Sequence, residues 1–176
     1  MELGPVDRIT ADAVGTPGDR TFYIQARAGE ELVTVIVEKQ QVQLLAASVL
    51  ELLEVAPAAE PEADESTMSL EEPLFPRWRA GRLSIGFDEE RDLFLLEVVE
   101  FQPDLDELDV EDPPPMLPET EPESIRIWAS PAQMLALSRH GAAVAARGRP
   151  TCQFCGNPID AEGHTCPAMN GHSKRD

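Results

Sequence analysis

The amino-acid sequence predicts a two-layer α+β fold, in which a duplicated β-β-β-α unit builds a six-stranded, largely antiparallel sheet with two helices on one face. Three observations predict this fold. Two stretches share one order of strand and helix patterns, acidic proline-rich segments separate their parts, and a tail contains every cysteine. Hydrophobic residues make up 42% of the 176 residues, as is typical of folded domains. We therefore expect a duplicated domain over residues 1–147 and a small zinc-ribbon-like tail over residues 148–176.

The first repeat, residues 1–56, contains three strand patterns and one helix pattern. Its second and third strands are rich in β-formers and are joined by Gly29 and Glu30, which supply a tight turn. After them, apolar residues recur at intervals of three and four, as on one face of a helix. The strands are expected over residues 7–13, 20–28 and 31–37, and the helix over residues 40–55, with Val42, Leu45, Val49, Leu52 and Leu53 on its apolar face.

The second repeat, residues 77–147, has the same order of elements. The start of its helix is marked by a capping box, because Ser130 and Gln133 can each bond the other's backbone while Pro131 fits the first helical position. The strands are expected over residues 82–87, 92–101 and 124–129, and the helix over residues 131–146.

The two repeats are expected to share one core. Three antiparallel strands expose one apolar face, which a single amphipathic helix can cover only in part. Two such units side by side would complete the cover, so the predicted fold has a pseudo-twofold axis between its halves.

Acidic residues are concentrated in two proline-rich loops, which we place at residues 57–76 and 102–123. From Glu54 to Pro76 the chain has seven acids and no Lys or Arg, and the second loop has nine acids and no base. Proline removes backbone donors and like charges repel, so neither loop is expected to be regular over its full length. We interpret both as solvating linkers, and binding to a basic partner protein is the alternative.

The formal net charge of −19 argues against several functions. It repels phosphate, which disfavours nucleic-acid binding, and it disfavours adhesion to anionic membranes. The chain begins without an apolar leader, and its three cysteines all fall within residues 152–166, unlike the even, dispersed set of a secreted protein. We expect a cytoplasmic protein that binds neither nucleic acid nor a membrane.

The cysteine-rich tail predicts a zinc site. Cys152 and Cys155 have the spacing at which two thiolates bind one ion, and Cys166 supplies a third. The fourth ligand is either His164, which lies on the same side of an extended strand as Cys166, or His172, which a turn signal could bring back to the metal. We favour His172 and keep His164 as the alternative. Four protein ligands leave no position for water, so the Zn²⁺ is expected to be structural; free redox-active thiols are the other interpretation.

The pattern Cys-x-x-Cys-Gly-x-Pro-x-Asp-x-x-Gly-His-x-Cys-Pro-x-x-Asn-Gly, from Cys152 to Gly171, resembles the tail of an actinobacterial family of conserved proteins of unknown function. The resemblance extends over nearly the full chain, including the start Leu3-Gly-Pro-Val-Asp. It implies an actinobacterial cytoplasmic protein without an established catalytic activity. It also implies, as an alternative role, regulation of a ParA-type partition ATPase. The family provides no catalytic residues to transfer.

The motifs of common catalytic sites are missing: the sequence has no glycine-rich phosphate loop, no Gly-x-Ser-x-Gly and no His-Glu-x-x-His. The basic-aromatic cluster from Arg77 to Arg82 is interpreted as a strand end bridged to nearby acids, with an anchor for a partner as the alternative. We expect a non-enzymatic protein-interaction or regulatory module that binds a protein partner. An enzyme or small-molecule binder with a pocket between the two repeats is the rival hypothesis.

Overall fold

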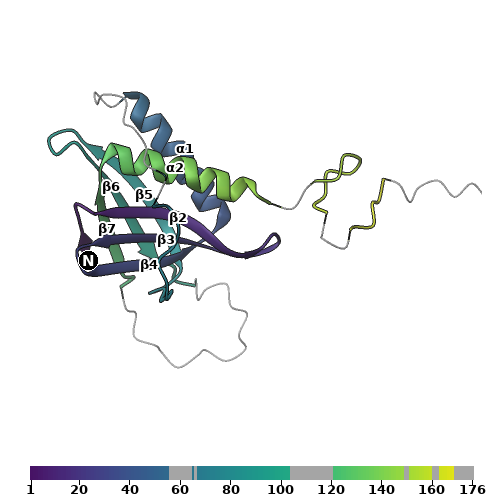
Figure 1. The fold of residues 1–176 in the computed structure, drawn as a ribbon, viewed down its shortest axis with the longest axis horizontal. Coiled ribbons are helices and arrows are strands. Elements are labelled where there is room, and N and C mark those ends of the chain that lie inside the picture. Colours follow the sequence, from purple (N-terminus) through teal and green to yellow (C-terminus); the bar gives the residue numbers. More distant parts are fainter. Residues whose placement is uncertain (56–64, 66, 104–120, 149–150, 160–162, 169–176) are drawn as a thin grey trace, which may run out of the picture.

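The computed structural model describes residues 1–55, 65, 67–103, 121–148, 151–159 and 163–168 (Figure 1). These ranges contain both strands and helices, so the α+β class is confirmed. No helix within them is long and apolar enough to cross a membrane. The elements in chain order are β1 (Glu2–Leu3), β2 (Arg8–Thr16), β3 (Asp19–Ala28), β4 (Glu31–Val37), α1 (Lys39–Val55), β5 (Ala80–Asp88), β6 (Leu93–Glu100), β7 (Ser124–Ala129) and α2 (Pro131–Ala146).

All the predicted strands and helices are present, with ends that differ by three residues or fewer. The capping box of α2 is also present: Gln133 N–H donates to Ser130 Oγ at 3.3 Å, and Ser130 N–H donates to Gln133 Oε1 at 2.8 Å. β1, which was not predicted, pairs in parallel with β7 through Leu3 and Ile127. Two residues are too few to show a periodic pattern.

The prediction of a single six-stranded sheet is wrong. β2, β3 and β4 form one antiparallel sheet, and a second sheet has the order β1-β7-β6-β5. In the described chain, the two sheets meet at one parallel bridge between Ile36 and Arg79, just before β5. Directly after that bridge, the register of β5 on β6 shifts between Ala80 and Arg82. Such a bulge bends a strand and ends its pairing, so β5 does not continue alongside β4.

The two helices pack against each other and share one hydrophobic core with both sheets. They cross one another above the strands in the view of Figure 1. Ser138 on α2 donates its hydroxyl to the Ala46 carbonyl of α1 at 2.9 Å. Gly141 permits the close approach, because a Cβ at this position would lie 3.0 Å from Val42 Cγ1. The apolar face predicted for α1 therefore faces α2 as well as the strands.

Each helix packs mainly on strands of the other predicted repeat. α2 contacts β2, and α1 contacts β5. This reciprocal arrangement explains how one core forms from the two halves, because each helix covers mainly strands of the other half. The duplication itself, and the division of the chain at residue 147, stay predictions.

Residues 67–72, here called the strap, belong to the first acidic loop and contact the face of β2 and β3 opposite the core. Thr10 donates its hydroxyl to the Met68 carbonyl. The Gln25 side chain accepts from Glu71 N–H at 2.8 Å and donates to the Glu71 carbonyl at 3.1 Å. Met68 and Gln25 are buried, so the strap is packed rather than solvated. Residues 57–64 and 66 of the first acidic loop and residues 104–120 of the second lie outside the described residues.

Candidate metal centre

The cysteine-rich tail begins with a short hairpin that presents the first two thiols. Thr151 pairs with Pro158 across the hairpin, and Cys152 N–H donates to the Asn157 carbonyl at 2.8 Å. Gly156 N–H donates to the Cys152 carbonyl at 2.9 Å and closes the turn. The φ of Gly156 is +73°, a conformation that glycine adopts without steric cost. A glycine after the second cysteine therefore lets the chain fold back beneath the sulfurs.

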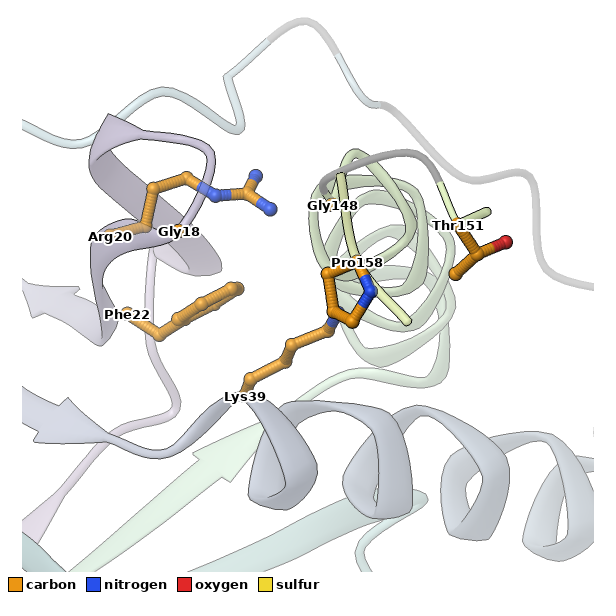
Figure 2. Close-up of a pocket in the computed structure, with 7 residues that line it drawn as sticks. All are labelled: Gly18, Arg20, Phe22, Lys39, Gly148, Thr151 and Pro158. Carbon is orange, nitrogen blue, oxygen red and sulfur yellow. The ribbon is translucent and has the colours of Figure 1, made fainter. Parts of the chain in front are cut away.

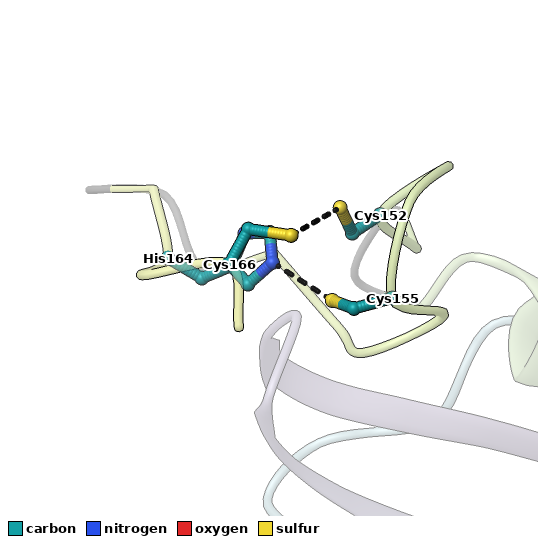
Figure 3. Close-up of side chains that lie close together, drawn as sticks. All are labelled: Cys152, Cys155, His164 and Cys166. Atoms are coloured by element: carbon teal, nitrogen blue, oxygen red, sulfur yellow. Dashed lines mark hydrogen bonds between the residues drawn. The ribbon is translucent and has the colours of Figure 1, made fainter. Parts of the chain in front are cut away.

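Three thiols and one imidazole converge at this hairpin (Figure 3). The ligand atoms of Cys152, Cys155, His164 and Cys166 all lie within 4.8 Å of one another. Cys152 Sγ is 3.7 Å from Cys166 Sγ, and Cys155 Sγ is 3.2 Å from His164 Nε2. A tetrahedral ion with Zn–S bonds of about 2.3 Å requires an S–S edge of about 3.8 Å, whereas a disulfide requires about 2.05 Å. The spacing therefore fits one ion with four ligands, and all three cysteines are free.

The surroundings of the first two thiols shift their pKa values in opposite directions. Backbone hydrogen bonds from Cys155 and Phe154 lower the pKa of the Cys152 thiol to about 7, and Phe154 N–H lies 3.4 Å from that sulfur. The pKa of Cys155 is raised: a hydrogen bond with the Asn157 backbone lowers it, but burial and the neighbouring thiols together outweigh that bond. Because cysteine binds a metal as the thiolate, a bound cation would favour the ionised form of both thiols.

The structure brings together four of the five predicted metal ligands. His164 lies in the cluster, two residues before Cys166, as expected for side chains on one side of an extended segment. His172, which the sequence analysis favoured, lies outside the described residues, so its part in the site stays a prediction. The described residues thus include four candidate ligands for one metal ion, His164 among them.

Residues 1–166 match the model of a family described as a protein of unknown function (DUF3090). The chain belongs to this family. The matched range contains all four clustered residues and ends at Cys166, six residues before His172. No curated protein and no solved structure matches the chain. The predicted membership of a family of unknown function is therefore confirmed, while the actinobacterial origin stays a prediction.

The basic-aromatic cluster from Arg77 to Arg82 contacts nearby acidic side chains. Arg77 lies 3.6 Å from the Glu31 carboxylate, and Arg79 forms an ion pair with Glu38. Trp78, between these two arginines, donates its indole N–H to a Glu123 carboxylate oxygen at 3.2 Å. These contacts fit the interpretation of a strand end held by neighbouring acids.

A hollow of about 240 Å³ lies between the two predicted repeats, where α1 faces β5. Its apolar lining residues come from both elements, and Arg82 is the single charged residue of its described lining. Three uncharged polar residues, Gln41, Ser48 and Ser84, also line it. The rival hypothesis of a site between the two repeats stays a prediction. Its apolar lining residues are Leu44, Leu45, Leu83 and Ile85.

Proposed function

We propose that this chain is a non-enzymatic protein-interaction or regulatory module whose tail is held together by one structural Zn²⁺. The observation that carries the proposal is the cluster of Cys152, Cys155, His164 and Cys166. Thiolates and imidazoles are ligands that zinc prefers. Four protein ligands complete a tetrahedron without water, so the ion would stabilise the tail rather than activate a substrate.

The tail needs such an ion because it has almost no core of its own. Among its described residues, 151–159 and 163–168, only Cys152 and Cys166 are buried. A segment with so little apolar burial needs a metal or a cross-link to hold one conformation. The free energy of zinc binding would therefore act as folding free energy for the tail.

An exposed aromatic side chain supports the interaction role. Phe154 lies between the first two cysteines and is 70% exposed. A zinc ion bound by Cys152 and Cys155 would hold the turn that presents this ring. Aromatic anchors contribute strongly to protein interfaces because they bury a large area at a small entropic cost. The proposed partner is a protein with an apolar pocket that accepts this ring.

Metal analysis of chain variants tests the zinc proposal. After expression with added zinc, the purified protein is expected to hold about one zinc per chain. His164→Ala and Cys166→Ser are expected to lose most of it, because each leaves an incomplete tetrahedron. His172→Ala is the matched control and is expected to keep the metal. A wild-type zinc content below about a tenth of an equivalent would contradict the proposal, and loss of zinc in His172→Ala alone would remove His164 from the ligand set.

Capture from a native lysate tests the interaction role. A partner retained by the wild-type chain is expected to be lost with Phe154→Ala, which removes the ring, and with Cys166→Ser, which removes a metal ligand. Gln153→Ala changes the exposed neighbouring residue and is expected to retain the partner. Equal capture by all four proteins would show that the tail does not form the interface.

A further inference from the structure

An open cavity of about 370 Å³ lies where the tail meets the body of the protein (Figure 2). Arg20 and Phe22 of β3 and Lys39, the first residue of α1, line it from the body, and Thr151 and Pro158 line it from the tail. We propose that this cavity binds a small organic anion, whose phosphate or carboxylate group is held by Arg20 and Lys39.

The two cations at the cavity are unusual in a chain with a net charge of −19 and only two lysines. Arg20 Nη1 donates to the Val144 carbonyl at 3.0 Å, and its guanidinium lies 5.4 Å from the centre of the Phe22 ring. These contacts fix the direction of the guanidinium. Its other N–H groups and the Lys39 ammonium have no hydrogen-bond or ion-pair partner among the residues that the structure describes, so they are free to bind an anion.

A structural role explains only one of the donors of Arg20 and Lys39, namely the Arg20 Nη1 group that bonds the end of α2. The last turn of α2 contains no basic residue, and positive charge near that end is favourable because the helix dipole is negative there. The Arg20–Val144 contact satisfies this need. Glu38, which precedes Lys39, lines an adjoining hollow of about 130 Å³ together with both cations, and it forms an ion pair with Arg79. Glu38 is therefore engaged by Arg79 rather than by Arg20 or Lys39.

The lining of the cavity restricts the class of anion. A guanidinium and an ammonium that line one cavity both attract the oxygens of a phosphate or carboxylate group, and an arginine can bind such a group with two hydrogen bonds. Phe22 and Pro158 add apolar walls, which favour an organic body over a bare inorganic ion. The volume is near the lower end of the range of about 300–1,000 Å³ for ligand pockets, which fits a small molecule.

The cavity depends on the tail for one wall. Thr151 directly precedes the first cysteine of the metal centre, and Pro158 lies opposite it in the same hairpin. The zinc ion of the proposed function would therefore shape this wall, and to that extent the inference rests on the proposed function. The two cations are on the body, so anion binding and zinc binding can be measured separately.

Titration of the zinc-loaded full chain with phenyl phosphate, followed by amide NMR, tests the inference. Shifts are expected at Thr21, Phe22 and Thr151, and the Kd is expected to rise about tenfold in Arg20→Gln and in Lys39→Gln. Arg91→Gln is the matched control, because it removes the same charge from a side chain that lies over Trp128 instead of at the cavity. Its Kd is expected to equal that of the wild type. No shift up to about 10 mM, or the same Kd in all four proteins, would overturn the inference.

Two further ligands and one further measurement separate the outcomes. Benzoate in place of phenyl phosphate shows whether a carboxylate or a phosphate is the preferred group. Inorganic phosphate is expected to bind more weakly than phenyl phosphate, and equal binding would contradict the role of the apolar walls. The zinc content of each sample is measured in parallel. Anion binding by a chain without zinc would contradict the proposed function alone, and a zinc-loaded chain that binds no anion would contradict this inference alone.

Discussion

Glu71 shows how an acidic residue in a proline-rich loop can be structural. Its carboxylate forms ion pairs with Arg8, at 2.8 Å, and with Arg27, while its backbone is bonded by Gln25. The acidic, proline-rich composition of this loop predicts a solvated linker. The arginines that bind Glu71 lie 63 and 44 residues earlier in the chain, and composition contains no information on such distant pairs.

The ion pairs of Glu71 predict a pH-dependent contribution to stability. Its pKa is lowered because Arg27 hydrogen-bonds the carboxylate, although burial opposes the shift, and Arg8 adds to it. A carboxyl group with a lowered pKa in the folded state stabilises the fold above its ordinary pKa of 4.5, and the contribution is lost as the pH falls through the folded value. We expect Glu71→Gln to reduce the free energy of unfolding by up to about 1 kcal/mol near pH 7, since solvent screens a carboxylate that is 35% exposed.

Urea denaturation near pH 7 and near pH 3.5 measures this difference between wild type and Glu71→Gln, which is expected to shrink at the lower pH. Glu72→Gln is the matched control, because it removes the same charge from the adjacent exposed residue. A loss of stability equal in the two variants, or one that does not change with pH, would show that the ion pairs do not stabilise the strap.

The candidate metal ligands differ in how far the sequence determined their positions. The spacing of Cys152 and Cys155, with a glycine after them, specifies a local turn, and the structure has that turn. The choice between His164 and His172 depended on whether the chain after Cys166 turns back, which spacing alone does not decide. The cluster contains His164 because an extended path places it beside Cys166 without a further turn.

The helices and strands were predictable because their signals are local. Ser130, Pro131 and Gln133 specify the start of α2 within four residues, and the structure has the whole capping box. A high content of β-formers likewise indicates β3 and β6, whose inward side chains are buried. Such patterns depend on neighbours in the chain, so a single sequence contains enough information to assign them.

The capping box of α2 predicts a measurable loss of stability. Ser130→Ala removes the side chain that accepts from Gln133 N–H, and loss of an N-cap typically costs about 1 kcal/mol. The free energy of unfolding from urea denaturation is expected to fall by about that amount. Ser130→Asp keeps an acceptor and is expected to stay within about 0.5 kcal/mol of the wild type. An equal loss in both variants would mean that packing, not the cap, determines the effect.

The arrangement of the strands into sheets was harder to predict from the sequence than the strands and helices themselves. The need to bury the apolar faces of the strands correctly predicted that the two halves share one core. The pairing of their edge strands, however, depends on a bulge in β5. The bulge lies at Gly81, where a Cβ would come within 2.9 Å of Phe101 Cα. This close approach joins residues that are distant in the chain, so the strand pattern of residues 82–87 gave no sign of it. The result, among the described residues, is two sheets that meet at the bridge between Ile36 and Arg79.

The metal centre connects the tail to the function proposed for the whole chain, and X-ray absorption at the zinc edge of the purified protein tests it most directly. The account predicts one zinc with three sulfur ligands at about 2.3 Å and one nitrogen ligand at about 2.0–2.1 Å, with no oxygen in the first coordination shell. A spectrum with fewer than three sulfurs, or with a bound water, would contradict a closed structural site made by Cys152, Cys155, His164 and Cys166.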